Sequence, residues 1–247
     1  MQRHQVILDL LKQKGAVKLQ ELVLATDSSE STIRRDLIEL ERRRLLKRIH
    51  GGAALLQTKG AEPTIAEKST KNLQIKQRIA ATAASLVEPG DCIYLDAGST
   101  TLEMVPHLQA KNLTVVTNGF AQLEALAERQ IRAYLLGGMI KLSTRAMIGS
   151  MALESLRLYR FDKCFLGTNG IDLELGYTTP DPEEAMIKKT AARLASQAYV
   201  LADGQKFHEV AFAKVADIHE MRIITDKLPE EQRQSYLNQT DIIEVDT

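Results

Sequence analysis

The segment 29–53 constrains the fold of this 247-residue chain more than any other part of it. Ser29 can cap the N-terminus of a helix, since apolar residues recur after it at helical spacing: Ile33, Leu37 and Leu40. A basic stretch over 46–50 follows and ends at Gly51-Gly52, which can supply the positive φ of a tight hairpin turn. A short helix followed by a basic hairpin is the winged form of the helix-turn-helix, which binds DNA.

The opposite face of this predicted helix has side chains that suit DNA. That face holds Thr32, Arg35, Asp36, Glu39 and Arg43, with Arg34 at its flank. Hydroxyl and guanidinium groups contact phosphates and base edges in the major groove. Residues 34–48 contain seven basic side chains against three acidic ones, so we favour DNA contact over the alternative that these charges only solvate an exposed helix. The predicted DNA-binding residues are Ser29, Ser31, Thr32, Arg34, Arg35, Lys47, Arg48 and His50.

The residues before this helix complete the predicted module. Apolar stripes predict helices over 2–14 and 18–26, with Gly15 ending the first helix and Asp27-Ser28 forming the turn into the next one. Residues 1–56 contain eleven lysines and arginines against seven acidic residues, whereas the whole chain is neutral. A basic N-terminal segment on an acidic remainder predicts a winged helix-turn-helix domain over 1–56, with double-stranded operator DNA as its partner.

A change of composition separates this module from the rest. Residues 57–74 are polar and contain Gly60 and Pro63, which predicts a linker before a second domain over 75–247. No apolar run is long enough to span a membrane, and the first residues form an amphipathic helix instead of a signal peptide, so a cytoplasmic protein is expected. Cys92 and Cys164 stand alone within apolar strands, which predicts neither a disulfide framework nor a zinc site. No cofactor is expected.

The second domain alternates apolar strands with helical patterns. The predicted strands are 92–95, 113–116, 133–136, 163–166, 199–202, 222–224 and 242–245. The predicted helices are 75–87, 101–109, 120–129, 150–158 and 182–197. This alternation predicts an α/β domain with a mainly parallel sheet and helices on both of its faces.

Small and polar residues follow five of these strands, over 96–101, 117–119, 137–138, 167–170 and 203–206. In open α/β sheets the carboxyl edge binds ligands, so we predict a site for a small phosphorylated polyol there. Backbone N–H groups and hydroxyls at a helix start suit a phosphate, Asp and Asn side chains suit sugar hydroxyls, and a lysine can neutralise a phosphate. The predicted effector-binding residues are Asp96, Gly98, Ser99, Thr100, Thr101, Thr117, Asn118, Gly137, Gly138, Asn169, Asp203 and Lys206.

Local explanations compete with this predicted site. A Gly-Gly pair is often only a turn and a Ser-Thr-Thr run is often only a helix cap, but five polar strand ends together favour a pocket. The segment 177–184 is predicted as a loop and a helix start, with Pro182 in the first turn. Whether Glu184 and Lys188 face the pocket is left open. The histidines show no metal-ligand spacing, so neither a metal site nor a catalytic residue is predicted.

The order of these features resembles a known family. The apolar first helix, Ser-x-x-Thr-Ile-Arg-Arg-Asp-Leu from Ser29 and Lys-Arg-Ile-His-Gly-Gly-Ala from Lys47 resemble the N-terminal signature of the DeoR family of bacterial transcriptional regulators. That family usually has a glycine where this chain has Arg44. The resemblance therefore implies either a left-handed residue at Arg44 or a helix that continues through it.

The resemblance extends over the second domain. The segments 96–101, 117–118, 137–138 and 203–206 match the motifs of the family's effector domain, although the last reads Asp-Gly-Gln-Lys where Asp-Ser-Ser-Lys is usual. The resemblance implies a fold similar to sugar-phosphate isomerases and a phosphorylated sugar as effector. Within the family, the segments 90–104, 159–165 and 176–182 resemble the fructose-operon repressors of Gram-positive bacteria, which implies fructose 1-phosphate.

These observations lead to one functional hypothesis and two rivals. We hypothesise a transcriptional repressor of a sugar operon, a homodimer or homotetramer that a phosphorylated sugar releases from DNA. The first rival is a sugar-phosphate isomerase or deaminase with a DNA-binding appendage, in which Asp96, Asp203, Glu184 and Lys206 supply acid–base groups. The second is an architectural DNA binder without a small ligand, which the polar strand ends disfavour because such a protein does not need them.

Overall fold

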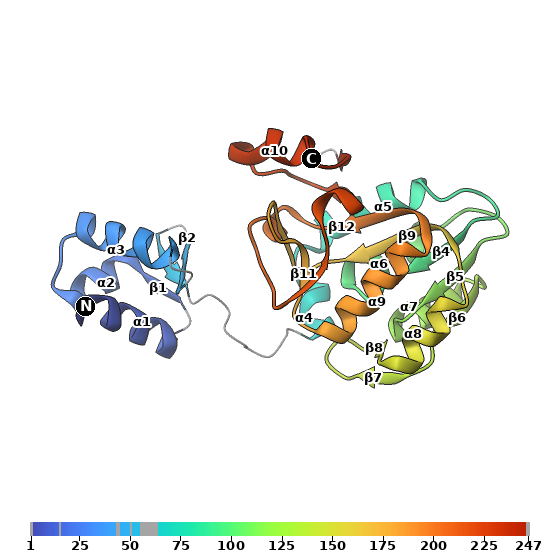
Figure 1. Ribbon diagram of the computed structural model, residues 1–247, viewed down its shortest axis with the longest axis horizontal. Coiled ribbons are helices and arrows are strands. Elements are labelled where there is room, and N and C mark those ends of the chain that lie inside the picture. Colours follow the sequence, from blue (N-terminus) through green and yellow to red (C-terminus); the bar gives the residue numbers. More distant parts are fainter. Residues whose placement is uncertain (1, 15, 43–44, 50, 55–63, 246–247) are drawn as a thin grey trace. The chain divides into compact units, whose positions relative to one another are not determined.

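The computed structural model describes residues 2–14, 16–42, 45–49, 51–54 and 64–245. The chain divides into two units, Met1–Glu62 and Pro63–Thr247, and each unit is described by itself (Figure 1).

The N-terminal unit is a three-helix module with a small antiparallel sheet. Its elements are α1 (Gln2–Lys14), β1 (Ala16–Lys18), α2 (Leu19–Thr26), α3 (Glu30–Arg42), β2 (Lys47–Ile49) and β3 (Gly52–Ala54). The sheet has the order β1-β3-β2, in which β2 and β3 form the predicted hairpin. The apolar stripes of the three helices meet in one buried core that includes Ile7, Leu22, Ile33 and Leu40. The winged helix-turn-helix prediction is confirmed, and β1 is an addition to it.

The structure corrects the position of Asp36, which the helical spacing places among the exposed residues of α3. Asp36 is 7% exposed, and its carboxylate binds two side chains of α1. Arg3 donates through Nε to Oδ2 and through Nη2 to Oδ1 at 3.0 Å, and His4 Nε2 lies 3.1 Å from Oδ1. Asp36 directly precedes the buried Leu37, so it borders the apolar stripe and faces the helix that covers this stripe. It holds α3 against α1.

A seven-stranded sheet forms the centre of the C-terminal unit, in the order β15-β14-β12-β9-β4-β5-β6. Its strands are β4 (Cys92–Leu95), β5 (Thr114–Thr117), β6 (Arg132–Leu135), β9 (Phe161–Gly167), β12 (Ala195–Leu201), β14 (Arg222–Thr225) and β15 (Ile242–Glu244). Every neighbouring pair is parallel. All seven predicted strands therefore belong to one parallel sheet.

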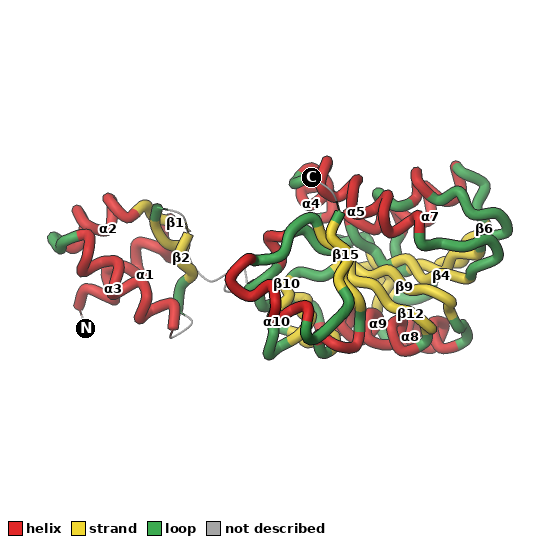
Figure 2. The backbone as a smooth tube through the Cα atoms, turned by 90° about the horizontal axis from the view of Figure 1, so that it is seen from above, coloured by secondary structure: helices red, strands yellow, loops and turns green. Residues whose placement is uncertain are grey.

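Helices cover both faces of this sheet, as Figure 2 shows. One face carries α5 (Leu73–Ser85) and α7 (Phe120–Glu128), and the other carries α8 (Ser150–Arg157) and α9 (Pro182–Arg193). Alternate residues of a strand point to opposite faces, so Ile93 packs with α5 whereas Tyr94 packs with α8 and α9. The shorter helical elements are α4 (Ile65–Thr70), α6 (Ser99–Leu102), η1 (Val105–His107), η2 (Gly204–Lys206), η3 (Ile218–Glu220), η4 (Glu230–Gln232) and α10 (Arg233–Leu237). The predicted α/β fold is confirmed.

Short antiparallel strands, which the sequence patterns do not predict, flank the main sheet. They are the hairpin β7 (Met139–Lys141) and β8 (Ala146–Ile148), and the sheet of β10 (Gly170–Asp172), β11 (Gly176–Thr179) and β13 (Ala213–Ala216). The strand β11 takes up residues 177–179 of the segment 177–184, which was predicted as a loop and a helix start, and the predicted helix start at Pro182 is confirmed by α9. Tyr177 is fully buried there and donates from its hydroxyl to the carbonyl of Met221 at 2.8 Å, so tertiary contacts fix an extended segment.

Two predicted helices have different bounds. The helix predicted over 101–109 is broken into α6 and η1, and Pro106 lies in the second piece, where it cannot continue an α-helical ladder. The helix predicted over 182–197 ends at Arg193, because residues from Ala195 onward pair with β9. Sheet pairing overrides the local propensity of this stretch.

The predicted linker over 57–74 also needs correction. Residues 55–63 lie outside the described residues, but α4 and the start of α5 occupy the remainder. Thr64 accepts from the N–H of Glu67 at 3.3 Å, and Glu67 accepts from the N–H of Thr64 at 2.7 Å, which is a capping box. None of the six residues of α4 is buried, so this helix has the polar composition that is typical of a linker.

Candidate functional site

The predicted DNA-binding residues of α3 lie at its N-terminal end. Ser31, Arg34 and Arg35 are exposed and Thr32 is half-buried. Ser29 precedes the helix and its hydroxyl accepts from the N–H of Thr32 at 3.3 Å, so it caps α3 as the sequence predicts. The hydroxyls of Ser29 and Thr32 lie 2.8 Å apart. Hydroxyl and guanidinium groups are thus presented together at the start of one exposed helix.

Two of the predicted arginines already have acidic neighbours. Arg34 pairs with Glu30 one turn earlier, with Nη2 2.6 Å from Oε1. Arg48 of β2 donates both its backbone N–H, at 2.8 Å, and its guanidinium Nε to the carboxylate of Glu41 on α3. Glu41 therefore ties the wing to the end of the recognition helix. His50, Arg43 and Arg44 lie outside the described residues, and so does the geometry expected at Arg44; of Lys47 only the backbone is described.

Asp96, at the carboxyl edge of the main sheet, forms a buried ion pair with Lys188 of α9. Asp96 is 1% exposed and Lys188 is 6% exposed. The backbone N–H of Gly167, at the end of β9, donates to the same Asp96 oxygen at 3.0 Å. Lys188, which the sequence left open, thus faces this edge together with β4 and β9.

Glu184 lies one turn before Lys188 on α9 and is also buried. The hydroxyl of Thr144 donates to Glu184 Oε1 at 2.6 Å, and Lys141 Nζ lies 3.3 Å from that atom and 3.0 Å from Asp181 Oδ2. Both partners of Glu184 come from the hairpin β7–β8 and its turn. The hairpin, absent from the sequence prediction, brings these charges to the carboxyl edge.

Three predicted effector residues are buried and bonded within the protein. The hydroxyl of Thr101 donates to the carbonyl of Asp96 at 2.6 Å, and that of Thr117 donates to the carbonyl of Leu95 at 2.5 Å. Asn118 accepts from the N–H of Ala97 at 2.9 Å and donates to the carbonyl of Met147 at 3.3 Å. These side chains hold the loop after β4 and the hairpin β7–β8 in place. Their effector contacts stay a prediction.

For the predicted effector residues of the Gly-Gly pair and of the Ser-Thr-Thr run, the structure offers local explanations. Gly138 has φ of 131°, and a Cβ there would lie 2.6 Å from the carbonyl oxygen of Ile148, so packing alone requires this glycine. Gly137 beside it is exposed. The helix α6 has only four residues, so its dipole at Ser99 and Thr100 is smaller than that of the predicted longer helix.

The end of β12 contains a second charged group, built on Asp203. Its carboxylate caps η2 by accepting from the N–H of Gln205 at 3.0 Å, and it accepts from Asn72 Nδ2 at 3.3 Å. Burial lowers the pKa of Lys206, against the opposing effect of Asp203, and Lys68 and Lys71 lower it further. Lys206 is half-buried and lies near Asp203 at the predicted phosphate end.

Lys76 of α5 belongs to the same group and was missed by the sequence analysis. It is 5% exposed and donates to the carbonyl of Lys68. Burial lowers the pKa of Lys76, Asp203 raises it and Lys206 lowers it. We call Lys68, Lys71, Lys76 and Lys206 the lysine cluster. Three of its members precede the predicted sheet, in a stretch interpreted as linker and first helix, and only the fold brings them to Asp203.

Asn169 lies between the two charged groups, at the end of β9. Its side-chain oxygen accepts from the hydroxyl of Thr179 at 3.1 Å, and its backbone N–H donates to the carbonyl of Thr178 at 3.1 Å. Because β9 separates β12 from β4, Asp203 and Asp96 end strands that are two spacings, about 10 Å, apart. The prediction that these strands end at one edge of the same sheet is correct.

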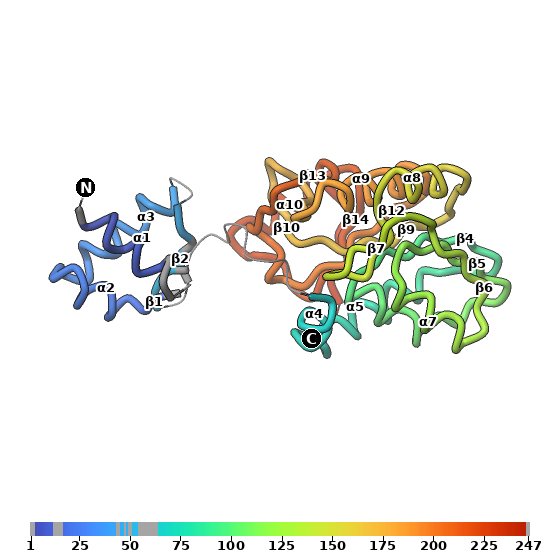
Figure 3. The backbone as a smooth tube through the Cα atoms, turned by 90° about the horizontal axis from the view of Figure 1, so that it is seen from below, coloured from blue at the N-terminus to red at the C-terminus, as the bar shows by residue number. Residues whose placement is uncertain are grey.

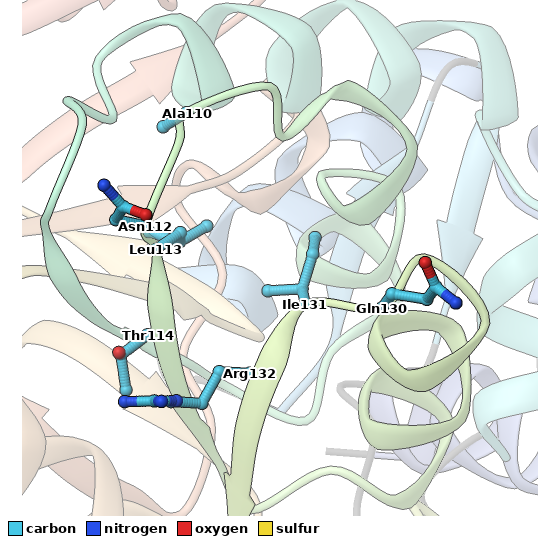
Figure 4. Close-up of a pocket in the computed structure, with 7 residues that line it drawn as sticks. All are labelled: Ala110, Asn112, Leu113, Thr114, Gln130, Ile131 and Arg132. Carbon is cyan, nitrogen blue, oxygen red and sulfur yellow. The ribbon is translucent and has the colours of Figure 1, made fainter.

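Two surface hollows of the C-terminal unit lie away from this edge. One is lined by residues at and just before the starts of β5 and β6 at the amino edge, among them Asn112, Gln130 and Arg132 (Figure 4). The other lies between α5 and η1 and is lined by Gln77, Glu103 and others. At the carboxyl edge itself, the charged side chains of Asp96, Glu184, Lys188 and Asp203 are buried. In the described part of the chain, no helix is long and apolar enough to span a membrane, and no cluster of side chains fits a metal ion.

Comparisons with known proteins agree with both units. Residues 3–59 match the DeoR-like helix-turn-helix domain, and residues 71–227 match the DeoR C terminal sensor domain. The HTH-type transcriptional regulator FruR of Bacillus subtilis (strain 168) is 51% identical over 240 residues, which cover 97% of this chain and 96% of that protein. The HTH-type transcriptional repressor GlcR of the same organism is 34% identical, with 90% and 87% covered. The lactose phosphotransferase system repressor of Staphylococcus epidermidis (strain ATCC 12228 / FDA PCI 1200) is 32% identical, with 96% of each covered.

Among solved structures, ribose 5-phosphate isomerase A of Methanocaldococcus jannaschii overlaps 56% of each chain, with a TM-score of 0.43 and 18% identity. The delta subunit of eIF2B from Chaetomium thermophilum overlaps 74% of this chain and 58% of its own, with a TM-score of 0.43 and 16% identity.

Proposed function

Because the chain belongs to the DeoR family of transcriptional regulators, we propose that it represses a fructose-utilisation operon and is released from operator DNA by fructose 1-phosphate. The names of its relatives support the choice of repression and of a sugar-derived signal, since they include a regulator named FruR and two repressors. The proposal concerns the operon, the effector and the residues that bind each ligand. A regulator of this kind acts on DNA in the cytoplasm.

The exposed N-terminal end of α3 supports the proposed DNA contacts. Ser31 and Arg35 are accessible in the free protein, and the cap at Ser29 fixes the start of the helix that presents them. The wing follows through β2, which Glu41 fastens to the same helix. Base contacts at α3 and phosphate contacts at the wing would together select an operator half-site. Two heads of a homodimer or homotetramer would bind successive major grooves.

The lysine cluster is the observation that carries the effector half of the proposal. Lys68 of α4, Lys71 after it, Lys76 of α5 and Lys206 of η2 gather near Asp203, and Glu103 is a second carboxylate near Lys76. Such a group has an excess of positive charge, which a phosphate dianion would neutralise. Binding would raise the pKa of Lys206 from its lowered value, because the phosphate favours the charged ammonium.

Release of DNA follows from linkage between the two sites. If the effector lowers operator affinity by some factor, operator DNA lowers effector affinity by the same factor. The helix α4 offers a route for this coupling, since it is the first described element after the head and contributes Lys68 to the cluster. Its start is also bound to the turn of the hairpin β7–β8, because the N–H of Ile65 donates to the carbonyl of Ser143 at 2.9 Å. Figure 3 shows the course of the backbone through α4 and β7.

Fluorescence anisotropy of labelled DNA from upstream of the chain's own operon tests the proposal. The full-length protein is bound to this DNA and titrated with fructose 1-phosphate, fructose 6-phosphate, glucose 6-phosphate and inorganic phosphate. Release by fructose 1-phosphate at lower concentration than by the others is the expected result. Tight binding that no sugar phosphate alters would overturn the effector half and leave the DNA-binding half standing. Release by another sugar phosphate alone would replace fructose 1-phosphate as the effector.

A further inference from the structure

The proposed phosphate end of the effector site is at the end of β12, and the Asp96–Lys188 pair is at the end of β4. Only β9 separates these strands, so their carboxyl ends lie about 10 Å apart, with the lysine cluster on the side of α5 and Lys188 on the side of α9. A phosphorylated hexose bound through its phosphate at the lysine cluster would therefore extend toward Asp96 and Lys188. The role inferred below for Asp96 and Lys188 rests on the proposed function and adds to it the residues that recognise the sugar.

The Asp96–Lys188 pair is costly for a fold to keep. Both side chains are more than nine-tenths buried, and removing two charges from water is only partly repaid by their mutual attraction. An apolar pair of similar volume would often stabilise a sheet edge equally well. The N–H of Gly167 fixes the carboxylate from a second strand, so the ammonium group of Lys188 is held in one orientation.

One polar group beside the pair, the hydroxyl of Tyr94, is not used by the fold. Tyr94 lies two residues before Asp96 on the same face of β4, and its hydroxyl is the one buried side-chain oxygen or nitrogen without a hydrogen-bond partner in the described part of the chain. Burial raises the pKa of Tyr94 first, and the nearby Asp96, Cys164 and Glu184 raise it further. Glu184 itself is held by Thr144 and Lys141. Oxygen and nitrogen atoms thus converge from β4, α9 and the hairpin β7–β8.

We propose that Lys188 is the specificity-determining residue at the sugar end of the effector site, where its ammonium group, oriented by Asp96, donates hydrogen bonds to the oxygen atoms of a phosphorylated ketose. An ammonium group has three N–H donors in all, so it can bind Asp96 and a ligand oxygen together. The Asp96 carboxylate can in turn accept from a sugar hydroxyl. A ligand with phosphate but no sugar would occupy the lysine cluster only.

The test compares ligands that have and lack the sugar part. Isothermal titration calorimetry of the full-length protein measures Kd for fructose 1-phosphate, and the rise in Tm measures binding of inorganic phosphate. Lys188→Met should raise the Kd for fructose 1-phosphate about tenfold or more, which corresponds to the loss of one charge-assisted hydrogen bond. The rise in Tm caused by inorganic phosphate should change less than about twofold. Lys188→Arg, which keeps the charge, should recover part of the loss. Lys189→Met on the same helix is the matched control and should bind both ligands as the wild type does.

A second variant separates recognition from folding. Lys188→Met leaves Asp96 buried without its ion-pair partner, which could destabilise the sheet edge. Asp96→Asn with Lys188→Met removes both charges and leaves neither of them unpaired. This double variant should keep the circular dichroism spectrum and phosphate binding of the wild type and should still lose about tenfold or more in affinity for fructose 1-phosphate.

The outcomes separate this inference from the proposed function. If the wild type binds fructose 1-phosphate and folded Lys188 variants bind it equally well, the inference is wrong and the proposed function stands. If the variants lose affinity for inorganic phosphate and for fructose 1-phosphate to the same degree, Lys188 supports the fold only, and the inference is again wrong. If the wild type binds no sugar phosphate, both are wrong.

Discussion

The two predicted binding surfaces differ in how open they are. On the N-terminal unit, Ser31, Arg34 and Arg35 are exposed along one helix, and a ligand can reach them without any rearrangement. On the C-terminal unit, Thr117 and Asn118 are buried and bonded to neighbouring elements. On the exposed surface of α3, the type of a residue is therefore enough to predict contact with DNA. At the carboxyl edge, residue type does not distinguish side chains that contact a ligand from side chains that hold the edge together.

The open surface gives the largest expected effect. Arg35→Ala removes a guanidinium group that contributes about 1–3 kcal/mol when it contacts a base edge. The proposed dimer would lose this contact twice, so operator affinity should fall about 100-fold or more. Fluorescence anisotropy on operator DNA measures the loss, and calorimetry should show effector binding unchanged. Gln5→Ala, at an exposed position of α1, is the control; equal operator binding by both variants would remove Arg35 from the interface.

The corresponding change at the carboxyl edge is Lys206→Ala. Loss of a charged hydrogen bond to phosphate should weaken the effector about 10- to 100-fold. Operator binding without effector should stay at the wild-type level, so the variant is a repressor that fails to release. Lys214→Ala, at an exposed lysine of β13, should respond normally. Normal release by Lys206→Ala would show that the phosphate binds elsewhere.

Asp36 is a buried side chain of the N-terminal unit that holds α3 against α1 and lies outside the exposed surface of α3. Asp36→Asn removes the ion pair with Arg3 and should cost the head about 1–2 kcal/mol of unfolding free energy. The hydrogen bond from Arg3 lowers the pKa of Asp36, so the wild-type stabilisation is present above the unfolded pKa of about 3.9 and is lost as pH falls through the lower folded value.

Urea unfolding at pH 7 and at pH 3, followed by circular dichroism, measures both effects. The difference between wild type and Asp36→Asn should shrink at the lower pH. Asp9→Asn, an exposed carboxylate on α1, should show no comparable difference. A constant difference at both pH values would mean that the ion pair does not titrate with folding.

The smallest expected effect concerns the wing. Glu41→Gln removes a negative charge that binds the guanidinium group of Arg48, so Arg48 gains freedom to contact phosphate. Operator affinity should rise about two- to threefold, and the salt dependence of binding should steepen by about one phosphate contact. Anisotropy titrations at several salt concentrations measure both values. A fall in affinity would instead show that Glu41 positions the wing for DNA.

The sequence predicts long, strongly patterned elements and misses short ones. All seven strands of the parallel sheet follow from apolar runs such as Cys92–Leu95, because burial on both faces leaves a continuous signal. The strands β7 and β8 have three residues each and depend on contacts with the rest of the fold, including those between Asn118 and Met147. No local pattern of that length separates them from a turn.

The candidate site follows the same division. Asp203 and Lys206 follow a predicted strand, so their place at the edge was predictable. Lys76 was not, because its neighbours in the chain indicate only a helix, and its burial beside Asp203 depends on packing over more than a hundred residues. A capping box at Thr64 and Glu67 is the one local signal that could have extended the second domain to include Lys68.

Opening of the helix α4 would lengthen the connection between the two units. Its backbone is held by the bond from Ile65 to Ser143 and by Lys76, which donates to the carbonyl of Lys68, and no residue of α4 is buried, so few contacts would break on opening. Six residues span about 9 Å as a helix and about 20 Å when extended. Operator half-sites lie about 34 Å apart, so a gain of roughly 10 Å on each tether changes which pairs of grooves two heads can reach together. Hydrogen exchange at the amides of α4 would report this length directly, since exchange slows wherever the helix stays closed.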